Sequence, residues 1–194
     1  MPIITRAASS LTRHCGDCQL CCRLLPVNEV NKPGGTVCRY QKFKKGCTVY
    51  STPKMPACCT LWNCRWLVND DTADLPRPDR AHYVIDLMPD FVTHQNDVTG
   101  ECINIQVVQI WIDPNHRDAY RDPALRSYMH RRAQEGTASI VRFNERDAIV
   151  IFPPPFDVDG EWHEIISTLR GPSHTFDQVE AALGSSARII VTDD

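Results

Sequence analysis

Nine cysteines lie within the fifty residues from Cys15 to Cys64, and the tenth, Cys102, stands apart. Their spacing reads CxxCxxCC, fifteen residues, C, eight residues, C, ten residues, CC, four residues and C. Two residues between cysteines let a tight turn present both sulfurs to one metal ion. Adjacent cysteines in an extended segment point to opposite sides, so Cys21 and Cys22 could serve two ions or two edges of one cluster. The spacing therefore predicts a metal centre, and a polynuclear one is plausible.

Cysteines also serve as core residues or as halves of disulfides. Free cysteines are common as small buried hydrophobes, but that role does not account for nine of them in a segment rich in glycine and proline. A disulfide framework needs an oxidising compartment, and residues 1–13 contain no apolar segment before a small-residue cleavage site. No run of eighteen apolar residues occurs, so no membrane span is predicted. We therefore expect a cytoplasmic protein that binds a metal ion.

The spacing leaves the identity of the metal open between zinc and iron. Eight thiolates recruited from several loops suit two closed four-sulfur zinc sites, which would hold together a segment poor in regular structure. The CxxCxxC run matches the first three ligands of the bacterial ferredoxin pattern, although the CxxxCP completion is missing. Zinc is our first prediction for the cofactor, and iron or an iron–sulfur cluster is the alternative.

Residues 14–67 resemble the YkgJ-type cysteine-cluster family, whose members carry a zinc- or iron-chelating domain with a CxxCxxCC motif. In that family the motif is followed by a lone cysteine, a GCxIY-like segment and an RPxxCRxFxC-like segment. The corresponding segments here are Cys38, residues 46–50 and residues 55–64. The resemblance implies eight metal ligands: Cys15, Cys18, Cys21, Cys22, Cys38, Cys47, Cys59 and Cys64. It extends in a general way to longer bacterial members, and it implies chelation without supplying a reaction.

The last segment departs from the family pattern. Met55 and Thr60 stand where the family has arginines, and the spacing after Tyr50 is longer than usual. Cys58 is then an additional thiol, either a substitute ligand or a packed bystander. His14, beside Cys15, is the histidine placed to compete as a ligand.

Charge divides the chain near residue 67. Residues 1–67 hold ten Lys and Arg against two Asp and Glu, and residues 68–194 hold eleven against twenty-two. Basic residues can neutralise ligating thiolates and donate to their sulfurs, which explains the basic half without nucleic-acid binding, and we disfavour the latter. We expect a cysteine-rich module over 1–67, a connector over 68–80 with two prolines, and an acidic domain over 81–194.

The acidic half predicts an α+β domain. Segments 82–94 and 101–113 are rich in β-branched and aromatic residues and predict an antiparallel hairpin, with Pro89 as a break or edge. Within the second segment the apolar alternation shifts after Val107, which predicts a bulge or burial on both faces. A helix is expected from Asp122 and Pro123 to Gly136, a second hairpin over 138–152, a strand over 162–168, a helix over 175–184 and a strand over 188–192.

The fold prediction is thus α+β, with a loop-dominated cysteine-rich metal module packed on a small, mainly antiparallel sheet with two or three helices. GxGxxG, P-loop, GxSxG and HExxH motifs are absent, so whether the chain is an enzyme stays open and no catalytic residue is assigned. The histidines of the acidic half are scattered in sequence and are interpreted as structural residues. We predict a metal-binding cysteine-cluster protein. The alternatives are an iron–sulfur protein with an electron-transfer or redox or group-transfer role, and a module that binds an unidentified protein partner.

Overall fold

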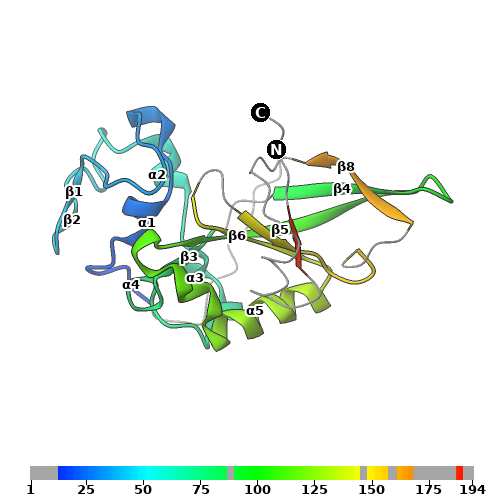
Figure 1. Ribbon diagram of the computed structural model, residues 1–194. Helices are drawn as coiled ribbons and strands as arrows, with labels where there is room; N and C mark the ends of the chain where they lie inside the picture. The colour runs from blue at the N-terminus through cyan, green and yellow to red at the C-terminus, as the bar shows by residue number, and fades with distance from the viewer. Residues whose placement is uncertain (1–12, 87–89, 145–147, 157–160, 168–186, 190–194) are drawn as a thin grey trace.

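The computed structural model describes residues 13–86, 90–144, 148–156, 161–167 and 187–189 (Figure 1). In this part of the chain a seven-stranded sheet has the order β8-β4-β5-β6-β7-β9, and β3 also pairs with β5. The strands are β3 (Tyr83–Ile85), β4 (Asp90–Asn96), β5 (Cys102–Ile112), β6 (Ala138–Arg142), β7 (Ala148–Ile151), β8 (Trp162–Ser167) and β9 (Ala187–Ile189). The pairings are antiparallel except that of β5 with β6, so the predicted α+β class and mainly antiparallel sheet are confirmed.

The long strand β5 organises the sheet. Its first half pairs with β4, its last three residues pair with β3, and β6 runs parallel along the other edge. The predicted hairpin is therefore confirmed for β4 and β5. The strand β3 is separate from β4 and pairs with the last residues of β5, on the same edge as β4. The second predicted hairpin is β6 with β7, and the predicted strand over 162–168 is β8, which pairs with β4.

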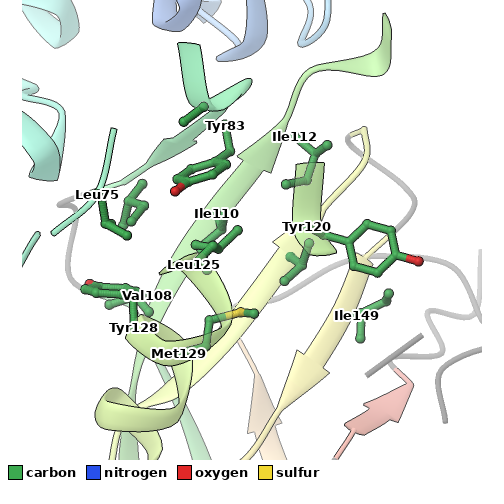
Figure 2. Packing of buried hydrophobic residues seen from close by; sticks show 13 residues of the cluster. Leu75, Tyr83, Val108, Ile110, Ile112, Tyr120, Leu125, Tyr128, Met129 and Ile149 are labelled. Carbon is green, nitrogen blue, oxygen red and sulfur yellow. The ribbon is translucent and has the colours of Figure 1, made fainter. Parts of the chain in front are cut away.

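Burial on both faces explains the shifted apolar pattern of β5. Val108, Ile110 and Ile112 pack into a core with helix α5 (Pro123–Gln134), which Figure 2 shows from close by. Val107 belongs to a second core, and Trp111 packs against the cysteine-rich segment. The register between β5 and β6 is continuous from Val107 to Trp111, so this pairing contains no bulge.

Helix α5 begins and ends at the predicted signals. The Asp122 carboxylate accepts a hydrogen bond from the backbone N–H of Ala124 at 2.9 Å, and Pro123 occupies the first helical position. Leu125, Tyr128 and Met129 form its buried stripe. Gly136 adopts a positive φ of 78° just beyond the last turn, as glycine does after many helices.

The cysteine-rich segment consists of short elements joined by turns, as predicted. They are α1 (Leu20–Leu24), η1 (Asn28–Val30), β1 (Gln41–Lys42), β2 (Gly46–Cys47), α2 (Ala57–Leu61) and α3 (Arg65–Val68). Figure 1 shows this segment at the end of the sheet that carries β3. Leu20 and Leu24 of α1 bury their side chains against Val84 and Trp111, so an apolar cluster joins the segment to the sheet.

The predicted connector is folded against its neighbours. It contains η2 (Asp70–Thr72) and α4 (Pro78–Ala81), and the side chains of Thr72 and Leu75 are buried. The Trp66 indole N–H donates to the Leu75 carbonyl at 3.0 Å, and the Arg13 guanidinium donates to the Thr72 hydroxyl at 2.9 Å. Residues before and after the connector therefore hold it in place.

Two predicted elements lie wholly or partly beyond the described residues. The helix expected over 175–184 falls outside them, and β9 overlaps the start of the strand expected over 188–192. Among the described helices, none has both the length and the apolar composition needed to cross a membrane.

Candidate metal centre

The first cysteine pair closes a tight turn, as its spacing predicts. The backbone N–H of Cys18 donates to the Cys15 carbonyl at 3.0 Å. Gly16, inside the turn, has a φ of +55°, a conformation that is unfavourable for residues with a side chain. The Arg77 guanidinium donates to the Asp17 carboxylate at 2.8 Å, which anchors the turn to the folded connector.

Cys21 and Cys22 lie on helix α1, so the expectation of an extended segment at this pair is wrong. Adjacent side chains on a helix point about 100° apart, rather than to the opposite sides expected of an extended segment. Cys21 packs in the apolar cluster that contains Cys18, and Cys22 interacts electrostatically with Lys32 and with Cys18. The Cys21 thiol also donates to Cys22, so this pair joins the two neighbourhoods.

Four predicted ligands share a neighbourhood beside α1. Cys18, Cys21 and Cys64 belong to the apolar cluster that joins the segment to the sheet, and Cys15 interacts electrostatically with Cys18 and Cys64. Cys64 is brought there by a β-bridge to Asp86, directly after β3. We call Cys15, Cys18, Cys21 and Cys64 the inner cysteine group.

Interactions between neighbouring thiols shift the pKa values of the cysteines in α1 and in the turn before it. The Cys15 thiol donates to the Cys18 carbonyl at 3.6 Å, and its interaction with the Cys18 thiol raises the pKa of Cys15 and lowers the pKa of Cys18 to about 7. Cys21 donates to Cys22, raising its own pKa and lowering that of Cys22 to about 7. Burial raises the pKa of Cys64 to about 11. Each donor and acceptor pair thus combines one protonated thiol with one that ionises readily.

A second set of thiols includes three that interact electrostatically with the buried Lys32, namely Cys22, Cys38 and Cys59, while Cys58 joins the set through Cys59. The Cys38 backbone N–H donates to the Cys22 carbonyl at 3.1 Å. Burial, followed by the nearby thiols of Cys58, Cys22 and Cys38, raises the pKa of Cys59 to about 12. We call Cys22, Cys38, Cys58 and Cys59 the outer cysteine group.

Lys32 supplies a positive charge to the outer cysteine group. Its side chain is only 6% exposed, and its ammonium donates to the carbonyl oxygens of Leu25 and, at 3.3 Å, Pro33. Burial lowers the pKa of Lys32, and the thiols of Cys38 and Cys22 oppose that shift. A buried ammonium beside several thiols stabilises their ionised form.

The pair Cys58 and Cys59 lies on α2, and the two sulfurs are 3.9 Å apart. The Glu29 carboxylate accepts hydrogen bonds from the backbone N–H groups of Ala57 and Cys58 at 2.8 and 2.7 Å. These bonds lower the pKa of Glu29 and fix α2 next to η1. The extra thiol Cys58 is therefore a neighbour of the predicted ligand Cys59.

Two cysteines are assigned to neither group. Cys47 is in β2, opposite Gln41 of β1, in the hairpin that Figure 1 shows extending away from the sheet. Cys102, which was not predicted as a ligand, is exposed at the start of β5. His14, the competing ligand of the prediction, is exposed before the Cys15 turn. All ten cysteines are among the described residues and all are free thiols.

The cysteines form neighbourhoods rather than closed ligand sets. Over the described ranges, no three cysteine sulfurs lie within 4.8 Å of one another. Sulfurs that share one tetrahedral zinc ion lie about 3.8 Å apart, since each Zn–S bond is about 2.3 Å. The inner and outer groups would therefore have to contract to close around an ion.

A different trio meets the 4.8 Å distance in the described part of the chain: His82, Asp113 and His116. We interpreted the histidines as scattered structural residues, and sequence analysis missed this group. The signal was topological, because His82 precedes β3, Asp113 follows β5, and these strands pair with Tyr83 opposite Ile112. Burial and the neighbouring His116 lower the pKa of His82.

Comparison of the chain with known proteins finds no relative. No protein-family model, no curated protein and no solved structure matches the chain.

Proposed function

We propose that the chain is a metal-binding cysteine-cluster protein of the YkgJ type, in which zinc organises the cysteine-rich segment. The observation that carries this proposal is the gathering of eight thiols near α1, in an inner and an outer group that meet at the Cys21–Cys22 pair. Seven of the eight predicted ligands belong to these groups, and Cys58 completes the outer one. Each group then offers four sulfurs, the number that a structural zinc site uses.

The helices of the cysteine-rich segment are too short to be stable without further links between them. Helices α1, α2 and α3 have five, five and four residues. Isolated helices of this length are not stable in water, because the cost of nucleation exceeds the gain from so few hydrogen bonds. A metal ion bound by residues from the Cys15 turn, α1 and Cys64 would hold these elements together and contribute directly to folding.

The charges around the thiols favour bound metal. Four thiolates on one divalent ion leave a net charge of about −2, which nearby cations offset. Lys32 faces the outer group. Arg13 interacts electrostatically with Cys64 of the inner group, and its guanidinium lies 4.4 Å from the centre of the Trp66 ring.

Element analysis of anaerobically purified protein tests the proposal. We expect up to two zinc ions per chain, lost together with the folded state of residues 13–68 when a strong chelator is added. Cobalt substitution should give the intense near-ultraviolet absorption of thiolate ligands. A metal-free protein whose cysteine-rich segment stays folded and reduced would overturn the proposal.

An iron–sulfur cluster with an electron-transfer or redox or group-transfer role is the second candidate. The feature that favours it is the CxxCxxC run, since Cys15, Cys18 and Cys21 all belong to the inner group. Leu20 and Trp111 pack in the same cluster, and an apolar environment tunes the potential of such a centre. A brown protein that contains iron and sulfide and is reduced reversibly would favour the iron–sulfur candidate over the zinc proposal.

A further inference from the structure

The group of His82, Asp113 and His116 is built by the backbone at the end of β3 and β5. The Asp113 N–H donates to the His82 carbonyl at 2.9 Å, which extends the β3–β5 pairing by one step. The His116 N–H donates to the Asp113 carbonyl at 2.8 Å, so the turn after β5 brings the second imidazole to the first. The three side chains are thus held together by main-chain hydrogen bonds.

Both histidines have unusual backbone conformations. His82 ends α4 in the left-handed region, at a φ of 61°. His116 interrupts the 3₁₀ helix η3 (Pro114–Arg121) with non-helical angles of φ −134° and ψ 55°. The left-handed conformation of His82 costs free energy and persists where the surrounding structure enforces it. The two backbone conformations place the two imidazole rings face to face, with centroids 3.5 Å apart and planes 13° apart.

Asp113 supplies a buried carboxylate beside the rings. Its side chain is only 1% exposed, and its Oδ2 lies 3.9 Å from the Nδ1 of His82. Oδ1 accepts from the Asn115 N–H at 3.0 Å, and Oδ2 accepts from the Arg23 guanidinium. Each carboxylate oxygen has two lone pairs, so each retains room for a further partner. Hydrogen bonds of this kind orient ligating carboxylates in metal sites.

We propose that His82, Asp113 and His116 form a second metal site, for a divalent first-row transition cation, separate from the cysteine groups. Two imidazoles and one carboxylate suit zinc, iron, nickel or copper, whereas thiolates are soft ligands that favour zinc, copper(I) and iron–sulfur clusters. The histidines also line a cavity of about 480 Å³, whose wall includes Arg80, Asn115 and Asp118. Three protein ligands beside a cavity leave coordination positions for water or a small anion.

Binding requires a modest rearrangement of the rings. The three ligand atoms lie within 4.8 Å of one another, and atoms about 2.1 Å from a common ion lie at most about 4.2 Å apart. His116 is exposed and His82 is partly exposed, so rotation of these side chains can unstack the rings without disturbing the core. Asp113 remains fixed by its hydrogen bonds.

The test uses the full chain with its cysteine groups already loaded with metal, to which zinc is then added alone. Nitrogen-15 spectra of the imidazoles should show His82 and His116 shifting together and saturating at a single further equivalent. His116→Ala should weaken this step by at least about tenfold, because one of three ligands is lost. His130→Ala, at an exposed histidine on α5, is the matched control and should leave the affinity unchanged.

A second variant tests whether weaker binding results from misfolding rather than from the loss of a ligand. His82→Asn keeps a residue that tolerates the left-handed conformation, and it should also weaken zinc binding by at least about tenfold. Unchanged shifts of His82 and His116 at saturating zinc, or equal shifts of all histidines, would overturn the proposal. Neither result bears on the cysteine groups, whose metal is counted separately by thiolate absorption of the cobalt form.

Discussion

Arg23, the residue after Cys22, donates a hydrogen bond to the buried carboxylate of Asp113, ninety residues further along the chain. Arg23 lies on α1 within the cysteine-rich segment, and Asp113 follows the central strand β5. The Asp113 side chain is 1% exposed, whereas that of Arg23 is 34% exposed. This ion pair connects the cysteine-rich segment to the sheet, in addition to the apolar cluster around Trp111.

Arg23→Ala should destabilise the protein by about 2 kcal/mol, because it leaves a buried carboxylate without its charged donor. A fully buried pair would lose more, but the partial exposure of Arg23 admits water. Urea unfolding measures the change. Arg121→Ala is the control, since its ion pair with Asp118 is exposed and 3.9 Å long, and it should leave the midpoint unchanged. Equal midpoints for both variants would show that Arg23 does not join the two parts of the fold.

Leu125→Ala should cost about 2–5 kcal/mol, because it opens a cavity in the core between α5 and the sheet. The Leu125 side chain is fully buried, and its cluster includes Ile110 of β5 and Met129 of α5 (Figure 2). Leu61→Ala removes the same atoms from a side chain that is 78% exposed, so the expected change is below about 0.5 kcal/mol. Thermal or urea unfolding compares the two, and a similar cost at both positions would contradict this packing.

Asp79→Asn should lower stability at neutral pH by less than about 1 kcal/mol, since the pair with Arg77 is partly exposed. The hydrogen bonds from Arg77 lower the pKa of Asp79 below its ordinary value of 3.8. The pair therefore contributes fully above that value, and its contribution is lost as the pH falls through the lower folded-state pKa. The difference in stability between the two proteins, measured by urea unfolding, should shrink as the pH falls below 3.8. A constant difference across this range would show that Asp79 acts without its charge.

Much of the sheet could be predicted because its signals are local. Alternating β-branched residues marked β4 and β5, and Asp122, Pro123 and Gly136 marked the limits of α5. The parallel pairing of β5 with β6 could not be predicted, because it depends on the direction in which α5 returns the chain to the sheet. The conformation of Cys21 and Cys22 was also missed, since a five-residue helix rich in cysteine has no periodic pattern.

The candidate sites show the same division between local and long-range information. The turn between Cys15 and Cys18 follows directly from its spacing and from Gly16. Which sulfurs share a neighbourhood depends on contacts far apart in sequence, such as the bridge that brings Cys64 beside β3. His82 and Asp113 become neighbours only through strand pairing, so no short motif could indicate them.

Serine substitutions should divide the cysteine metal content by group. Cys18→Ser removes a buried sulfur of the inner group, and Cys59→Ser removes one of the outer group. Serine is a poor ligand for soft metals, so each variant should lose the metal of its own group and keep that of the other.

Element analysis and thiolate absorption of the cobalt form measure that loss, which should approach half of the cysteine-bound metal for each variant. Because metal binding contributes to folding, the Cys18→Ser protein should also lose protection from proteolysis within residues 13–68. Cys102→Ser, at an exposed cysteine of β5, should leave both measurements unchanged. If Cys102→Ser lost as much metal as Cys18→Ser, the division into inner and outer groups would be wrong, since the bound metal would then depend on a thiol outside both.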